Sequence, residues 1–281
     1  MLNSDQQEDI GKARPEEMFS DIDRIRQDGI SSRAGLEETK EFISRYREEV
    51  DYGKIWSEND PVLFVGERHT VFADKDEIIN QMEGLKNLGM THLALEMIQS
   101  TDQYLIDKYV QGELERETLI RLLTYWDKRE GMAERYVQMI DKAISLDIKV
   151  IGIELPLMDD GSRQKFDQRN KSWASVIANQ VNSRDKARVV VFCGASHAGY
   201  YPKGDRTNNM LSSNYGIGSK VIDFTGGELT DNENFSIDET ISSAASSLGI
   251  SNDHFMIRNK IDESRPTDIY IHLPQKEKRL Y

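Results

Sequence analysis

Short apolar runs alternate with helical patterns along this chain of 281 residues, and this alternation restricts its fold more than any other feature. Six runs are typical of buried strands: 62–66, 91–96, 149–154, 188–193, 220–224 and 268–273. Three intervening stretches carry apolar residues at helical spacing: 76–88, 102–146 in three pieces, and 162–181. This order predicts an α/β fold with a mainly parallel sheet flanked by helices on both faces.

The first 55 residues differ from this pattern. Residues 18–52 show weak helical periodicity, which predicts one or two N-terminal helices packed on the main body. The first 15–20 residues are polar and charged, and we expect them to be poorly ordered. We therefore predict an N-terminal helical extension over 1–55 and one α/β domain over 56–281.

Composition excludes several classes of function. The formal net charge of −13 argues against nucleic acid or a membrane surface as the main partner. Cys193 is the only cysteine, so an intrachain disulfide and a thiolate metal cluster are both excluded. The N-terminus lacks the features of a signal peptide, and no apolar run approaches the ~20 residues of a membrane span. We expect a soluble, cytoplasmic protein that acts on a small-molecule or peptide substrate, and a homodimer stays open.

Ionisable residues stand where the predicted strands end. Gly66-Glu-Arg-His69 and Gly194-Ala-Ser-His197 each follow an apolar run, so the chain has two Gly-x-x-His strand ends. Ligands of open parallel sheets bind beyond the carboxyl ends of the strands. Five side chains are expected to meet there: Glu67, His69, Glu96, Glu154 and His197.

Two imidazoles and three carboxylates suit two kinds of chemistry. They could hold a divalent cation such as Mn, Fe, Co or Zn, or they could carry out metal-free general acid–base catalysis. Glu154 is as consistent with a surface charge or a helix-cap partner as with a site residue. His92, at the start of a strand, is expected to be structural, and His254 and His272 have no comparable context.

Two other motifs leave alternatives open. Arg169 and Asn170 lie on the apolar stripe of helix 162–181, where a guanidinium needs an anionic partner. Arg169 could form a structural salt bridge to one of the carboxylates or stabilise an anionic transition state. Gly194-Ala-Ser-His-Ala198 is similar to a nucleophile elbow with Ser196 as nucleophile; its triad would need Asp223 and then His254 or His272.

Four motifs in order resemble the ChaN-like/TIKI/TraB/erythromycin-esterase superfamily. They are Gly66-Glu-Arg-His69, Leu95-Glu-Met97, the Arg169-Asn170 pair and Gly194-Ala-Ser-His197. The resemblance spans roughly residues 60–225, and Thr267–Pro274 resembles the closing strand of that group. It implies an α/β fold with its site at the strand ends. It also implies activities that differ among members: metal-dependent peptidases, macrolide esterases without an evident metal, and haem or iron binding.

The resemblance implies Glu67, His69, Glu96, Arg169 and His197 as the site, with Glu154 less securely matched. We predict a hydrolase of an ester or amide, with a divalent metal held by Glu67, His69, Glu96 and His197, Glu67 as general base, and Arg169 stabilising the oxyanion. The first alternative is a haem- or iron-binding protein with Tyr200, Tyr201 or His197 as axial ligand. A partner-binding module without chemistry is a further alternative.

Overall fold

The computed structural model describes residues 33–124, 130–158, 164–183, 187–199, 206–227, 236–258 and 267–275. Within these ranges the helices are α2 (Arg33–Tyr46), α3 (Tyr52–Ile55), α4 (Phe72–Asn87), α5 (Gln103–Val110), α6 (Arg116–Thr124), α7 (Met132–Ser145), α8 (Phe166–Val181), α9 (Thr207–Tyr215) and α10 (Ser236–Ser247). The strands are β1 (Arg47–Glu49), β2 (Val62–Glu67), β3 (His92–Gln99), β4 (Lys149–Glu154), β5 (Val189–Gly194), β6 (Ser219–Gly226), β7 (Phe255–Arg258) and β8 (Ile269–Leu273).

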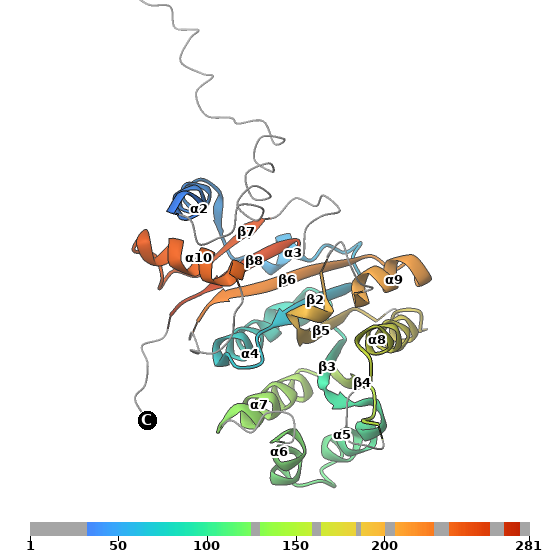
Figure 1. The fold of residues 1–281 in the computed structure, drawn as a ribbon. Helices are drawn as coiled ribbons and strands as arrows, with labels where there is room; N and C mark the ends of the chain where they lie inside the picture. Colours follow the sequence, from blue (N-terminus) through green and yellow to red (C-terminus); the bar gives the residue numbers. More distant parts are fainter. Residues whose placement is uncertain are drawn as a thin grey trace, which may run out of the picture.

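All eight described strands form one sheet in the order β1-β7-β8-β6-β2-β5-β3-β4 (Figure 1). Strand β2 lies near the middle, parallel to β5 on one side and to β6 on the other. Strand β7 alone runs against its neighbours, antiparallel to both β1 and β8. The chain moves outward from β2 to β3 and β4, and β5 then returns to lie between β2 and β3. The carboxyl ends of β2, β3, β4 and β5 therefore share one edge of the sheet.

Successive residues of the central strands pack on opposite faces, as the period of a strand requires. Leu63 and Val65 of β2 belong to the apolar cluster formed with α3, α4, α5, α6 and α7. Val62 and Phe64 belong to the cluster formed with α8 and α9. Because both faces of β2 are covered, all of its side chains are buried, and any charged residue at its end needs an internal partner.

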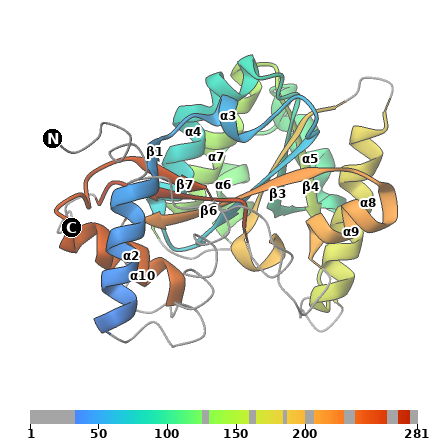
Figure 2. The ribbon, with the colours of Figure 1, turned by 90° about the horizontal axis from the view of Figure 1, so that it is seen from above.

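Each end of the sheet is closed differently. Helices α2 and α10 lie side by side along the β7–β8 end, which Figure 2 shows from above. At the opposite end, Gln103 of α5 occupies backbone groups of β4: its amide accepts from Gly152 N at 2.8 Å and donates to Val150 O at 3.0 Å. These two bonds take the place of a further strand and protect an edge that would otherwise be open to pairing.

The predicted fold class is confirmed, with all six predicted strands and with α2 inside the stretch 18–52 where N-terminal helices were expected. The part of that stretch before Arg33 lies outside the described residues. Helix α4 begins four residues earlier than the predicted start at Asp76, and it ends as predicted, with Gly89 at φ +93°. The sequence analysis missed β1, β7, α9 and α10.

The poor order expected at the extreme N-terminus falls outside the described residues. The domain boundary at 55/56 stays a prediction, although β1 pairs with the sheet. No helix in the described ranges is long and apolar enough to cross a membrane.

Stability should fall in mild acid because of His272. This imidazole is buried on β8, stacks on Phe255 at 4.8 Å, and burial lowers its pKa to about 4. A folded-state pKa below the ordinary 6.5 means that the stabilisation is present above pH 6.5 and is lost as the pH falls towards 4. The full shift corresponds to about 3 kcal/mol, of which we expect about 2 kcal/mol to be lost by pH 5.

The measurement is the free energy of unfolding by urea at pH 7.5 and at pH 5, for the wild type and for His272→Phe. The variant keeps an aromatic ring against Phe255 and removes the titrating group. We expect the wild type to lose more free energy between the two pH values than the variant. Equal losses in the two proteins would show that His272 does not control this pH dependence.

Candidate functional site

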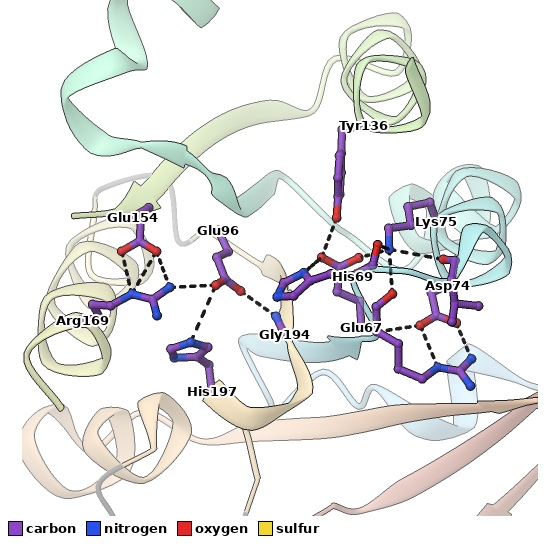
Figure 3. Close-up of polar contacts among 12 residues, drawn as sticks. Glu67, His69, Asp74, Lys75, Glu96, Tyr136, Glu154, Arg169, Gly194 and His197 are labelled. Carbon is purple, nitrogen blue, oxygen red and sulfur yellow. Dashed lines mark hydrogen bonds and ion pairs between the residues drawn. The ribbon is translucent and has the colours of Figure 1, made fainter. Parts of the chain in front are cut away.

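Four neighbouring strands bring ionisable side chains to one edge of the sheet, at the carboxyl ends of β2, β3, β4 and β5 (Figure 3). Six residues named in the sequence analysis meet there: Glu67, His69, Glu96, Glu154, Arg169 and His197. Glu67 and His69 contact α4 and α7 on one side of the sheet. Glu96, Glu154 and His197 contact α8 on the other side.

Glu67 is the last residue of β2, and its side chain is fully buried. One carboxylate oxygen, Oε1, accepts from the Tyr136 hydroxyl at 2.8 Å and lies 2.9 Å from His69 Nδ1. The other oxygen, Oε2, pairs with Lys75 Nζ at 2.6 Å. Burial alone would raise the pKa of this carboxyl, but the positive charges of Lys75 and His69 and their hydrogen bonds lower it to about 2. Glu67 is therefore ionised at neutral pH.

His69 is the part of this pair that faces solvent, with 42% of its side chain exposed. An ionised carboxylate can only accept, so Nδ1–H of His69 donates to Glu67, and the lone pair of the neutral ring lies on Nε2. Burial alone would lower the pKa of His69. The charge of Glu67 and its hydrogen bond, together with the charge of Glu96, raise that pKa above 6.5.

The turn that carries His69 is fixed by its neighbour in the sequence. Arg68 is buried, and its backbone N–H and guanidinium all donate to Asp74 of α4, at 2.6–3.1 Å. The same guanidinium donates to the carbonyl of Gly226 at the end of β6, at 2.8 Å. The β2–α4 turn is thereby attached to two elements.

Glu96 ends the straight part of β3 and is also fully buried. Its Oε1 accepts from Arg169 Nη2 at 2.8 Å, and its Oε2 accepts from the backbone N–H of Gly194 at 2.6 Å. Arg169 is bound at the same time by both oxygens of Glu154. The salt bridge that the sequence left open for Arg169 is thus present, and it involves two carboxylates.

Gly194 allows the two halves of the site to approach each other. A Cβ atom at this position would lie 2.9 Å from His69 Nε2 and 3.4 Å from Glu96 Oε2. The first distance is too short for a real side chain, so glycine is required if His69 is to keep this position. The glycine of the second Gly-x-x-His motif therefore makes room for the histidine of the first.

His197 lies on the other side of Glu96 and is buried between two rings. The centroids of Phe166 and Trp173 are each 4.4 Å from the centroid of the imidazole. Its Nδ1–H donates to Asn170 Oδ1 at 2.7 Å, which turns Nε2 towards Glu96 Oε1 at 3.7 Å. Asn170 thus fixes the tautomer of His197 as Glu67 fixes that of His69.

The predicted divalent metal does not fit these contacts. Three carboxylates, Glu67, Glu96 and Glu154, are opposed by Lys75 and Arg169, and the oxygens that a metal would need already accept hydrogen bonds or ion pairs. Within the described ranges, no group of three or more His, Cys, Asp or Glu side chains is arranged to hold a metal ion. The predicted ligands do lie together at the carboxyl ends of the strands, but their side chains are not arranged around a common point where a metal ion could bind.

Of the haem ligands predicted from the sequence, the structure describes His197. Only 5% of the His197 side chain is exposed, and its Nε2 faces Glu96 Oε1 at 3.7 Å, so a haem iron cannot reach Nε2 unless the surrounding side chains move. Tyr200 and Tyr201, the other predicted ligands, lie outside the described residues.

The serine-nucleophile alternative is not supported by the contacts of the two histidines that it requires. His272 packs on Phe255, and its Nε2 lies 3.4 Å from the carbonyl of Ser251. His254 pairs with Glu77 at 3.3 Å. In the part of the chain that the structure describes, no hydrogen bond joins Ser196 to either of them.

Two residues of the site were missed by the sequence analysis. Lys75 lies on the buried stripe of α4 with Ile78 and Met82, so a charged residue at helical spacing among apolar ones was the available signal. Tyr136 lies in the apolar core with the rest of the buried face of α7, but its hydroxyl reaches Glu67. No spacing in the sequence indicates that contact.

The two histidines should share one tautomer in solution, and Asn170 should control it in His197. We expect neutral His69 and His197 both to carry the proton on Nδ1. Asn170→Leu removes the acceptor for His197, so its Nε2–H form should appear, because that proton can then bond to Glu96. Long-range ¹H–¹⁵N spectra of the imidazoles measure this directly, with His69 as internal control. An unchanged His197 spectrum would contradict the assignment.

Comparisons with known proteins concern the family and the fold of the chain. A family model described as "Haem-binding uptake, Tiki superfamily, ChaN" matches residues 56–159, which include β2 and β3 with Glu67, His69 and Glu96. No curated protein matches the chain.

Among solved structures, an erythromycin esterase, EreC, in its open conformation is similar with a TM-score of 0.55 at 9% identity, covering 79% of this chain and 92% of that one. A Bacillus cereus protein is similar with a TM-score of 0.53 at 10% identity, covering 85% and 97%. The type III effector HopBA1 is similar with a TM-score of 0.52 at 16% identity, covering 77% and 88%. The family match confirms the resemblance of residues 56–159 to the ChaN/Tiki superfamily, and the solved structures show that the fold is shared.

Proposed function

We propose that this protein hydrolyses an ester or an amide with His69 as general base and without a bound metal ion. The observation that carries the proposal is the buried Glu67 carboxylate on Nδ1 of a half-exposed imidazole, which leaves the lone pair of the neutral ring on Nε2. The fold shared with an erythromycin esterase supports the idea that a sheet edge of this kind can accommodate ester hydrolysis.

In the proposed reaction, His69 Nε2 removes a proton from water as the water oxygen attacks the carbonyl carbon of the substrate. The imidazolium that forms is stabilised by Glu67 through Nδ1–H, and by the nearby charge of Glu96. When the tetrahedral intermediate collapses, the same Nε2–H protonates the departing alcohol or amine. The proton taken from water thus leaves with the alcohol or amine, and His69 is neutral again.

This assignment changes two of the roles predicted from the sequence. Glu67 has a pKa of about 2 and no exposed oxygen, so it orients and stabilises His69 and is not itself the base. Arg169 donates to two carboxylates, so we assign it to holding Glu96, not to the oxyanion. His197, facing Glu96 from the other side, remains a candidate for binding the substrate or its leaving group.

Hydrolysis of p-nitrophenyl esters and of a matching anilide, in the presence and absence of a chelator, tests the proposal. We expect ester or amide hydrolysis that a chelator leaves unchanged. His69→Ala should lower kcat by about 10²- to 10⁴-fold, the usual contribution of a general base.

Ser196→Ala is the matched control, since Ser196 follows the same kind of strand end but is exposed, and its side chain forms no hydrogen bond with a histidine in the described ranges. It should retain full activity. Complete loss of activity in chelator, with recovery on adding Mn²⁺ or Zn²⁺, would refute the metal-free mechanism. Full activity of His69→Ala would refute the role of His69 as general base.

The pH dependence of kcat/KM should report His69. The ring acts as a base only when neutral, so activity should rise with pH through its pKa, which lies above 6.5. Glu67→Gln removes the charge that favours the imidazolium, so the acidic limb of the profile should move to lower pH while the maximal rate falls. If the acidic limb of the kcat/KM profile lies at the same pH in Glu67→Gln as in the wild type, a group other than His69 controls it.

Haem binding is the second candidate, and it is favoured by the description of the matching family model. A haem titration monitored by absorbance tests it. A shift of the Soret band that His197→Ala abolishes would require Glu96 to move away from Nε2 of His197 and would support this candidate. The absence of a Soret band at stoichiometric haem would count against it.

A further inference from the structure

We propose that Lys75 is a positioning residue of this site: its ammonium group occupies the place that a metal ion would take beside Glu67 and holds the His69 turn in its working geometry. This inference rests on the proposed function, because it concerns the same histidine. It assigns a role to a residue that does not face the substrate side and that no sequence motif indicated.

The ammonium group of Lys75 is completely buried and surrounded by oxygen. Nζ lies 2.6 Å from Glu67 Oε2, and it donates to three backbone carbonyls: Arg68 O at 2.8 Å, His69 O at 2.9 Å and Val71 O at 3.2 Å. The ring of Tyr136 lies on a further side, with its centroid 5.4 Å from Nζ. An ammonium has three N–H donors, so four oxygens at these distances use all of them.

Packing alone does not require a charge at this position. Lys75 shares the buried face of α4 with Ile78, Met82 and Leu85, and a methionine would fill similar space there. A buried ion pair seldom adds net stability compared with apolar residues of the same volume, because both groups lose their hydration. The cation therefore calls for a reason other than stability, and its contacts supply one.

These contacts control His69 in two ways. The three carbonyls all belong to the turn between β2 and α4. Lys75 therefore fixes the backbone from which the His69 ring projects. Lys75 and His69 also bind opposite oxygens of one carboxylate, so Lys75 sets the direction in which Glu67 presents Oε1 to Nδ1. Loss of the ammonium would free both the carboxylate and the turn.

Charged groups face His69 from three elements. Glu67 of β2 and Glu96 of β3 favour the imidazolium, and Lys75 of α4 opposes it. Without the positive charge of Lys75, the two carboxylates would raise the pKa of the His69 ring further. The base would then be protonated over more of the neutral pH range.

Lys75→Met tests the inference, with Lys171→Met as the matched control on an exposed position of α8. The pKa of His69 is measured by NMR titration, and kcat/KM for p-nitrophenyl acetate is measured across the same pH range. In Lys75→Met we expect a higher His69 pKa, an acidic limb moved to higher pH by the same amount, and a kcat/KM lower by about 10- to 100-fold at pH 7, a loss of the size seen when supporting contacts are removed at metal sites. Lys171→Met should match the wild type.

The double variant Lys75→Met/Glu67→Gln separates positioning from packing. Removing one partner leaves a buried charge unpaired, whereas removing both does not, so the double variant should be more stable than Lys75→Met alone. An unchanged His69 pKa and rate in a folded Lys75→Met would overturn the inference, and so would failure of both variants to fold, which would make Lys75 a packing residue. The titration needs no substrate, so inactivity of the wild type would refute the proposed function and leave this test intact.

Discussion

The site depends on one constraint: a carboxylate at the end of a strand covered on both faces needs a cation inside the protein. Glu67 on β2 has Lys75, and Glu96 on β3 has Arg169, which also binds Glu154. Each cation comes from a helix on a different side of the sheet, α4 or α8. The positions of these two helices are therefore coupled to the two carboxylates, and the space between the carboxylates is where His69 lies.

In this arrangement, side-chain cations lie where a metal ion lies in many carboxylate sites. Metal sites often hold several carboxylates together because the ion cancels their repulsion. Here two fixed side-chain cations cancel most of that repulsion and leave one net negative charge among the five groups Glu67, Glu96, Glu154, Lys75 and Arg169. A single proton on an imidazole balances that charge. The raised pKa of His69 is the expected consequence of a cluster built in this way.

The fold and the location of the site follow from local features of the sequence, whereas the partners within the site do not. Apolar runs fix β2 and β5, and their terminal glycines mark the edge at which ligands of a parallel sheet bind. The four-residue strand β7 and the three-residue β1 are too short to show a periodicity, so pairing between them is visible only in three dimensions. The bond from Tyr136 to Glu67 spans 69 residues of chain, and no local pattern encodes such a contact.

The two Gly-x-x-His strand ends look equivalent in the sequence, but the surroundings of their histidines differ in exposure and in the group that Nδ1 contacts. His69 has an ionised carboxylate on Nδ1 and 42% of its side chain exposed, so it can gain and lose a proton in contact with solvent. His197 has a neutral amide on Nδ1, the Glu96 carboxylate 3.7 Å from Nε2, two aromatic rings at 4.4 Å, and only 5% of its side chain exposed. A base that exchanges protons with solvent requires the first setting, whereas the second holds the imidazole in one orientation. The difference arises from the residues that surround each motif, because both motifs supply the same glycine and the same imidazole.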